Sequence, residues 1–419
     1  MLVHYFPPVT SGLRPLRLRR AMIGDLRRIH LAAAWCGMSW GQRLARLAAM
    51  PVWPLVVLVS SLAWQVPRHG RRARIQGGRS IPLQVLDQLR LAITANMWPH
   101  HYYMFELYRP ELRARAHEYL LRQETKHGAF TILKDEAKKN RTFAHKDDFA
   151  TACAAAGLPH VAIIARISRG EVTWSNGHAT LPPIDLFIKP VKSQGGRGAE
   201  RWRWRDGVYE GAGGVRVTAG TLLERLRQQA PGMDVLIMPC LANHPAFAGL
   251  ALGALSTLRI VTCRNEIGAP EVMATALRFP RRDEAVVDNF HAGGLAALVD
   301  LSSGIVGPAT DMGLSRDSAW YARHPVTDVV IDGFVVPFWP EAKALAETAH
   351  VLLGDRVIVG WDVAILPDGP CLIEANGFPD LDIIQRCGRM PLGQTRICGL
   401  LLQHLRVRYP IWRRRSGLA

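Results

Sequence analysis

The 419-residue chain is too long for one ordinary hydrophobic core and is expected to fold as two or three packed units. With 48% hydrophobic and 21% charged residues it is globular in composition, which excludes a mainly disordered or coiled-coil protein. Its seven cysteines are scattered singly without a CxxC pair, which excludes a cysteine-rich zinc module and argues against a disulfide framework. We therefore expect buried thiols and a reducing compartment.

The net charge of +17 is concentrated in the first eighty residues. Residues 1–80, called the leader below, hold thirteen arginines, no lysine and a single acid, so +12 of the excess lies there. A basic terminus indicates attraction to a polyanion, either nucleic acid or anionic lipid. Nucleic acid is the less favoured partner, because no aromatic stacking surface or known reader motif accompanies the arginines.

An apolar run without formal charge extends from Leu47 to Val66 within the leader. Twenty residues of helix are about 30 Å long, roughly one hydrocarbon core. Trp53 and Trp64 lie where interfacial anchors would, and the run begins too far along the chain for a secretory signal. Three interpretations stay open: a helix that spans a membrane, a helix that lies on its surface, and a helix that packs against the rest of the chain.

The elements after the leader predict an α+β fold that is preceded by a helical segment. Residues 68–80 form a polar, loop-like boundary, and residues 82–140 have the spacing of helices. A short helix over 146–157 opens an α+β region, and a second helix is expected over 340–355. Apolar runs predict strands over 161–167, 184–190, 235–241, 257–263, 272–279 and 357–366. The expected domains are the leader 1–80, a helical lead-in 81–144, an α+β domain 145–400 and a basic tail 401–419.

The first chemical signal is Lys189 at the end of an apolar strand, followed by glycines at 195, 196 and 198. Backbone N–H groups at glycines can approach an anion closely, and a lysine at a strand end supplies a point charge for phosphate oxygens. The loop matches neither a Walker loop nor GxGxxG. A hairpin turn with a solvated lysine is the alternative interpretation.

The second signal is a predicted β-hairpin with a Pro-Asp-Gly-Pro turn, whose strands carry Asp362, Glu374 and Asn376. If Ala364 pairs with Leu372, Asp362 lies opposite Glu374 and Asn376 is one step away. Two carboxylates so close repel each other unless a cation lies between them, and Mg²⁺ prefers such oxygen ligands. The alternative is one acid in a salt bridge and the other in solvent.

Together these motifs resemble the ATP-grasp superfamily, and more narrowly its sugar-transfer-associated group. The match covers about residues 145–390, and residues 99–108 resemble that group's helical lead-in. The segments that carry the resemblance are KDDF with AAAGLP (146–159), DLFIKPVKSQGGRG (185–198), VLIMPCLANHP (235–245), TLRIVT (257–262), ALRFP (276–280), VDNFHAGG (287–294) and GWDVAILPDGPCLIEANG (360–377).

The resemblance implies two α+β lobes that hold ATP between them, and it assigns roles residue by residue. Nucleotide-binding positions are the phosphate lysines Lys146 and Lys189, the loop glycines Gly195, Gly196 and Gly198, and the adenine-contacting linker Met238, Pro239, Cys240 and Leu241. Pro239 and Cys240 stand where the family often has an acid that reaches the ribose, so the ribose contact is not assigned. The matching Mg²⁺ ligands are Asp362, Glu374 and Asn376, with Mn²⁺ as an alternative ion.

Three further polar residues are expected to act on the transferred group. Arg259 and Arg278 would bind the transferred phosphate or the acceptor carboxylate, because a guanidinium grips both with two N–H groups; surface charge is the alternative. Asn289 would orient the metal or the γ-phosphate. His291 is expected to be structural rather than a base, and His244 is not distinguished.

The resemblance implies a ligase that activates a carboxylate as an acyl phosphate for attack by an amine or a similar nucleophile. The acceptor is expected in cell-surface polysaccharide or sugar-conjugate synthesis, and the protein in the cytoplasm, attached to the inner face of the membrane if the leader binds lipid. Two alternatives are a kinase on the same fold and a non-catalytic, membrane-tethered nucleotide-binding protein.

Overall fold

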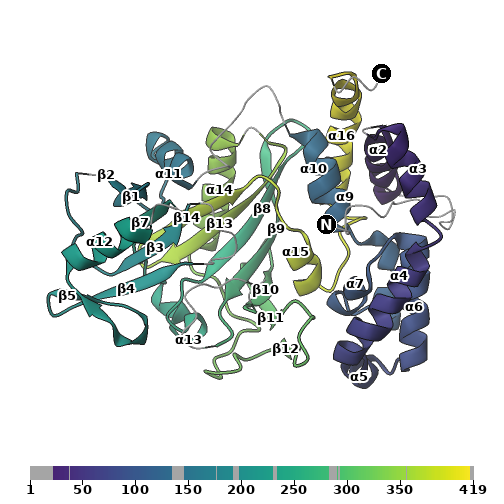
Figure 1. Cartoon of the computed structure of the whole chain (residues 1–419), viewed down its shortest axis with the longest axis horizontal. Coiled ribbons are helices and arrows are strands. Elements are labelled where there is room, and N and C mark those ends of the chain that lie inside the picture. The colour runs from purple at the N-terminus through teal and green to yellow at the C-terminus, as the bar shows by residue number, and fades with distance from the viewer. Residues whose placement is uncertain are drawn as a thin grey trace.

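The structure is a computed structural model that describes residues 22–36, 38–134, 146–175, 177–191, 198–229, 234–282, 290, 293–354 and 356–415. Within these residues, two antiparallel seven-stranded sheets lie beside a group of N-terminal helices (Figure 1). The predicted α+β class with a helical segment before it is confirmed. We call the two sheets the first and second sheet, in chain order.

The first sheet has the strand order β2-β1-β7-β3-β4-β5-β6. Its strands are β1 (Ala165–Ser168), β2 (Glu171–Trp174), β3 (Leu186–Pro190), β4 (Glu200–Arg205), β5 (Val208–Glu210), β6 (Arg216–Val217) and β7 (Val235–Pro239). Leu186 and Ile188 of β3 join Leu222 and Leu226 of helix α12 (Ala219–Gln229) in one core. Because side chains alternate along a strand, Phe187 and Lys189 point to the opposite face.

The second sheet has the order β12-β11-β10-β9-β8-β13-β14. Its strands are β8 (Thr257–Arg264), β9 (Pro270–Phe279), β10 (Leu295–Val299), β11 (Val306–Thr310), β12 (Trp320–Tyr321), β13 (Ile358–Leu366) and β14 (Gly369–Asn376). One face packs on helix α14 (Trp339–Leu353), and the other packs on α2 (Met22–Cys36), α10 (Phe130–Leu133), α15 (Asp382–Cys387) and α16 (Arg396–Arg415). The shorter helices α11 (Lys146–Ala155) and α13 (Ala248–Ala251) complete this body.

The helices at both ends of the chain share the core of the second sheet. Ile23 of α2 and Leu401 of α16 lie in the same buried cluster as Val261 and Ile358 of the sheet. The domain boundary expected at residue 400 therefore falls inside α16.

The apolar run Leu47–Val66 is not one helix. Helix α3 (Trp40–Ala49) ends before Trp53, where a second helical stretch begins and continues through α4 (Trp53–Ser60), a π turn η3 (Ser61–Gln65) and α5 (Val66–Gly77). No single helix among the described residues is long and apolar enough to cross a bilayer. The pair Trp40–Ala49 and Trp53–Gly77 meets the length and hydropathy requirement when taken together, but it is bent by 56°.

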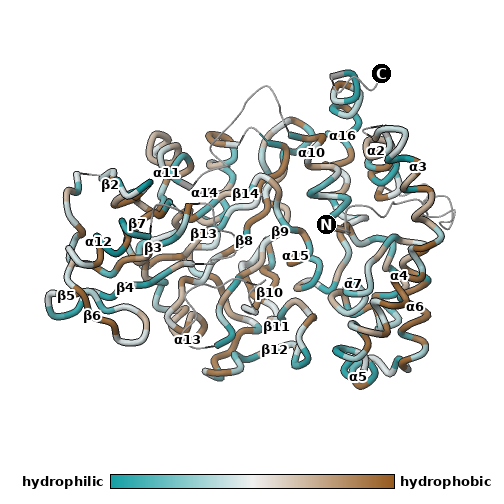
Figure 2. Tube along the Cα trace, in the orientation of Figure 1, coloured by the Kyte–Doolittle hydropathy of each residue, from teal (hydrophilic) through white to brown (hydrophobic). Residues whose placement is uncertain are grey.

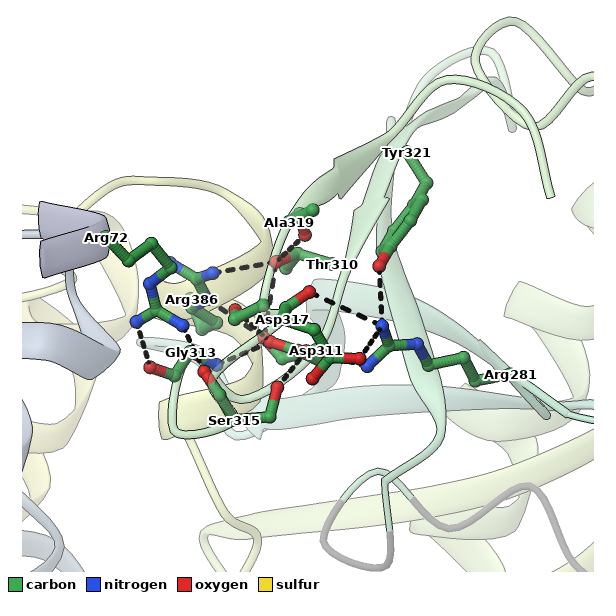
Figure 3. Close-up of polar contacts among 11 residues, drawn as sticks. Arg72, Arg281, Thr310, Asp311, Gly313, Ser315, Asp317, Ala319, Tyr321 and Arg386 are labelled. Carbon is green, nitrogen blue, oxygen red and sulfur yellow. Dashed lines mark hydrogen bonds and ion pairs between the residues drawn. The ribbon is translucent and has the colours of Figure 1, made fainter. Parts of the chain in front are cut away.

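One face of the Trp53–Gly77 stretch is fixed to helix α6 (Ile81–Ala95). Trp53 and Val57 are buried against Ala92, and the Ser61 hydroxyl donates to the Gln88 side chain at 2.7 Å. Farther along, Arg72 of α5 donates to the Gly313 and Ser315 carbonyls beyond β11, which ties the leader to the second sheet (Figure 3).

The lead-in is more broken than its sequence pattern predicts. After α6 and α7 (Pro99–Met104), residues 110–133 form α8 (Pro110–Ala114), η4 (Ala116–Glu118), α9 (Arg122–Glu124), η5 (Thr125–Ala129) and α10. Tertiary hydrogen bonds replace helical ones at the break. The Arg27 guanidinium donates to the carbonyls of His117 and Tyr119, and the Gln385 amide makes bonds of 2.9 Å with both the N–H and the carbonyl of Leu120.

Candidate active site

A stripe of polar side chains crosses four strands of the second sheet. The backbone register places Arg278 of β9 opposite Thr257 of β8, Arg259 of β8 opposite Asp362 of β13, and Asp362 opposite Glu374 of β14. Because paired residues in neighbouring strands project to the same face, these side chains share one side of the sheet. It is the side on which α10, α15 and α16 pack.

Asp362 is the centre of this stripe, and two guanidinium groups hold it. Arg259 approaches the carboxylate with two nitrogens, at 2.5 and 3.2 Å, and Arg278 Nη2 lies 3.0 Å from Oδ2. Arg278 also donates to the Thr257 hydroxyl at 3.1 and 2.5 Å. Burial alone would raise the pKa of Asp362, but Arg259 and then Arg278 outweigh it, so this pKa is lowered and the group is ionised at neutral pH.

The hairpin pairs Asp362 with Glu374 as predicted, although by a different register. The expected pairing of Ala364 with Leu372 is wrong, because Ala364 pairs with Cys371 and Val363 with Leu372. A β-bulge leaves Ile373 unpaired between these partners and Glu374. The bulge shifts the register by one residue, so Leu372 can face the core while Glu374 stays opposite Asp362.

The side-chain oxygens of Glu374 and Asn376 have no partner among the described residues. Both side chains are half-buried, and within the described part of the chain neither makes a hydrogen bond or ion pair. They lie two residues apart on β14, so they project to the same face. This donor set fits a hard cation that also binds phosphate and water. Among the described residues no group of three His, Cys, Asp or Glu could hold a metal, so Asn376 would be needed as a ligand.

Asp362 is in salt bridges and Glu374 is half exposed, which agrees with the alternative interpretation of the acid pair. Arg259 and Arg278 are not surface charges. Each guanidinium side chain is only 11% exposed. Desolvation of this kind strengthens the attraction between guanidinium and carboxylate, which fixes both arginines beside Asp362.

Lys189 lies on the face of the first sheet that is turned away from helix α12. It is buried and lines a narrow pocket together with Met238 of β7 and Leu372 and Ile373 of β14. The two sheets meet here, because Leu372 donates to the Pro159 carbonyl at 2.9 Å and its own carbonyl accepts from Val161 at 3.2 Å. Lys189 of the first sheet and the acid hairpin of the second sheet are thus brought to one pocket.

This pocket is small in the structure. Its cavity volume is about 10 Å³, which is room for about one water molecule. A larger surface groove lies between α2 and α16, but none of the predicted site residues lines it. An adenine ring would therefore need Met238 or Phe149, which also lines the pocket, to move aside.

The predicted linker residues leave the first sheet at the end of β7. Met238 is buried in the pocket, and Pro239 ends the strand. The Cys240 N–H donates to the Asp185 carbonyl at 2.8 Å, so the backbone after β7 is held to the start of β3. Burial raises the pKa of the Cys240 thiol, which is neutral at pH 7. Leu241 follows without regular structure.

Several predicted positions lie outside the described residues. These are Gly195, Gly196, Asn289 and His291, together with the side chain of Lys146, whose backbone opens α11. Gly198 is described and has φ +73°, and a Cβ there would come within 3.1 Å of Pro190. This backbone conformation favours glycine, and a side chain there would also press on Pro190.

Sequence reasoning missed two groups beside the stripe. Lys126 of η5 donates to Asp380 at 3.3 Å, just beyond β14. Pro379 fills the space over Gly360, where a Cβ would also meet the Arg259 side chain, so this loop lies against the arginine. Burial lowers the pKa of Lys126, Asp380 opposes this, and the charges of Arg122 and Arg259 add to the lowering. The sequence signal that could have pointed to this loop is the pair of acids, Asp380 and Asp382, that follows the EANG segment.

A family model described as sugar-transfer associated ATP-grasp matches residues 127–395. None of the curated proteins matches the chain.

Solved structures with a similar fold include D-alanyl-alanine synthetase A from Vibrio cholerae (12% identity, TM-score 0.37, 64% of this chain and 66% of that chain). Others are L-amino acid ligase from Bacillus licheniformis (11%, 0.34, 61% and 47%) and VanG D-Ala:D-Ser ligase from Enterococcus faecalis (15%, 0.34, 63% and 61%). The chain thus spans between about half and two thirds of the length of these structures. On the family match over residues 127–395, the chain belongs to the sugar-transfer-associated ATP-grasp family.

Proposed function

We propose that the protein is an ATP- and Mg²⁺-dependent ligase that joins a carboxylate to an amine or a similar nucleophile. The observation that carries the proposal is the cross-strand stripe Arg278, Arg259, Asp362 and Glu374, which reaches the hairpin that meets Lys189 of the other sheet. Cations and carboxylates arranged in this way suit transfer of a phosphoryl group, for which positioning and charge neutralisation are the main requirements.

The reaction has two balanced steps. A carboxylate oxygen of the substrate attacks the γ-phosphorus of ATP, the bond to the bridging oxygen breaks, and ADP leaves. The amine then attacks the acyl-phosphate carbonyl, loses a proton, and inorganic phosphate leaves. Neither step needs a side-chain nucleophile, and the thiols of the half-buried Cys240 and the buried Cys371, whose pKa values burial raises, are not suited to act as one.

In this proposal residues of both lobes bind ATP and its metal ion, each lobe a different part. Lys189 and the glycine segment after β3 bind the phosphates, while Asp362, Glu374 and Asn376 hold Mg²⁺, with Mn²⁺ as an alternative. A bound divalent ion supplies positive charge to the phosphate oxygens. On family resemblance Lys146 is assigned to the phosphates, and Asn289 to orienting the metal or the γ-phosphate. The linker from Met238 to Leu241 binds adenine once its pocket opens.

Arg259 and Arg278 bind the acceptor carboxylate or the transferred phosphoryl group. Their guanidinium groups are already desolvated and held in place by Asp362, so they lose little freedom when an anion arrives. Lys126, which is paired with Asp380 beside Arg259, adds a third cation on this side. Three cations around one small region favour substrates that carry a carboxylate.

We propose a small-molecule or sugar-linked carboxylate as the substrate and an amine-type acceptor, in the synthesis of cell-surface polysaccharide or a sugar conjugate, at the inner face of the cytoplasmic membrane. The support for the setting is the family's association with sugar transfer and the basic, apolar leader.

The test is to incubate the purified full chain with ATP, Mg²⁺ and pooled cell-envelope precursors while following ADP, phosphate and new product masses. The proposal expects equal amounts of ADP and inorganic phosphate and a product that is joined with loss of water. A stable phosphorylated product without free phosphate would mean a kinase, and nucleotide binding without turnover would mean a non-catalytic protein; either result overturns the ligase.

A further inference from the structure

The outer face of the leader helices is apolar and uncovered. Trp40, Leu44 and Leu47 recur at i, i+4 and i+7 on α3, and they are 76%, 63% and 46% exposed. No residue of α3 is buried, so this helix contributes nothing to a core. An exposed apolar stripe on an ordered, capped helix marks a contact surface rather than a packing error.

The next helix also carries exposed apolar residues on one side. Trp53 and Val57 face α6, whereas Leu55, Val59 and Leu62 lie on the opposite side and are all more than half exposed. We call the six residues Trp40, Leu44, Leu47, Leu55, Val59 and Leu62 the leader face. Figure 2 shows the hydrophobic colours along α4 and α6, at the end of the molecule away from the first sheet, and hydrophilic colours on α5.

The exposed side of the same helix becomes basic after residue 64. Arg68, Arg71 and Arg74 of α5 are exposed, and no acid pairs with them in the part of the chain that the structure describes. From residue 26 to residue 86 the sequence holds nine arginines and not one acid. The charges next to the leader face along the chain are therefore positive, which favours an anionic partner over a basic one.

Aromatic side chains lie where the apolar and basic parts meet. The Arg68 guanidinium lies 5.0 Å from the centre of the Trp64 ring, and Arg43 lies 5.2 Å from that of Trp40. Tryptophan and arginine together are typical of the headgroup level of a bilayer, where the ring is half apolar and the cation meets phosphate.

The geometry points to a helix pair that lies on a bilayer rather than one that crosses it. The apolar part of the longer helix, from Trp53 to Trp64, is twelve residues, or about 18 Å, against about 30 Å of hydrocarbon. Its inner side is also occupied by α6, and a spanning helix would have to release those contacts. We infer that the leader face binds in the plane of an anionic phospholipid surface, with Arg68, Arg71 and Arg74 at the headgroup phosphates. This inference concerns the leader alone and does not depend on the reaction.

The experiment is co-sedimentation of the full chain with vesicles of phosphatidylcholine alone and with vesicles that also contain phosphatidylglycerol. We expect binding to the anionic vesicles that weakens at high salt. Replacing Leu55 and Val59 by glutamine should lower the partition by at least about 100-fold. Replacing Arg68, Arg71 and Arg74 by glutamine should lower it on the order of 100-fold, for anionic vesicles alone. Ile267→Gln is the matched control, since Ile267 is 88% exposed in the β8–β9 turn and should not change binding.

Three outcomes would overturn the inference. The wild-type chain could stay in the supernatant with anionic vesicles, or the Leu55 and Val59 variant could bind as wild type does. Light scattering could also show a dimer that this variant makes monomeric, which would mean that a second copy covers the face. ATP turnover in solution, measured on the same variant, should equal wild type, so failure of the lipid site and failure of the ligase are separable.

Discussion

The two sheets differ in how far their charged groups are already arranged for a ligand. On the second sheet Asp362 is held by Arg259 and Arg278, so these three groups are positioned before any ligand arrives. On the first sheet Lys189 is buried in a pocket that Met238, Leu236 and His160 also line and that has room for about one water. The second sheet is thus organised in advance, whereas the first must open to receive a nucleotide. Four variants test this contrast.

The largest effect is expected from Glu374→Gln, which keeps the shape of the side chain but removes the charge proposed to hold Mg²⁺. ADP release should fall on the order of 100- to 1,000-fold, with an unchanged circular dichroism spectrum. Glu171→Gln, on an exposed position of β2, is the control and should keep full activity. Turnover unchanged in Glu374→Gln would remove the proposed metal role.

Asp362→Asn tests the ion pairs that Asp362 forms with Arg259 and Arg278 on the second sheet. It removes the charge of the buried carboxylate that two guanidinium groups share, so the free energy of unfolding should fall by about 3 kcal/mol in urea denaturation. Asp328→Asn, which breaks the exposed pair with Arg323, is the matched control and should change it by less than about 1 kcal/mol. If the free energy of unfolding fell equally little in both variants, the ion pairs of Asp362 would not be formed in solution before a ligand binds.

Lys189→Met tests the first sheet by removing an ammonium while keeping its apolar stem. We expect kcat/KM for ATP to fall about 10- to 100-fold, as for the loss of one charged hydrogen bond. Lys343→Met on α14 controls for net charge, because the Lys343 ammonium donates to the Leu301 carbonyl and lines no part of the pocket. A fall in stability without a change in kcat/KM would make Lys189 structural.

The smallest effect concerns pH and the loop after β14. Burial, and then the neighbouring Asp380 carboxylate, raise the pKa of Asp382 well above its ordinary range. A folded-state pKa above the unfolded one contributes stability that is complete below the unfolded pKa and is lost as pH rises through the folded value. Asp382→Asn should therefore flatten the rise in stability toward acid pH and stabilise the protein near pH 7. If the free energy of unfolding of the variant and of the wild type changed in parallel with pH, the raised pKa of Asp382 would be refuted.

Much of the fold was predictable because its strands are short apolar runs between turn residues, as in residues 257–263 and 357–366. The opposition of Asp362 and Glu374 followed from alternation along the hairpin. The bulge at Ile373 was not predictable, since it depends on how Leu372 fits the core. The break near Leu120 was missed for a similar reason. The hydrogen-bond partner of Leu120 is Gln385, which is 265 residues away, so the local spacing of apolar residues could not indicate this contact.

The leader illustrates the same limit. Its composition predicted an apolar, basic segment, but the bend between Ala49 and Trp53 and the choice of Trp53 and Val57 as the inner side depend on contacts with α6. Lys126 and Asp380 were missed because they are 254 residues apart, and only the folded lead-in brings them to Arg259.

The shared core of α2, α16 and the second sheet bears on how this protein can be handled. Trimming it to the segment that matches the family would strip Ile23, Leu26 and Leu401 from Val261 and Ile358 and leave a wide apolar surface beneath the stripe. Such a fragment should aggregate on expression, whereas the intact chain should not. For structural and enzymatic work both ends should therefore be kept, and the leader face should be made more polar by point substitutions.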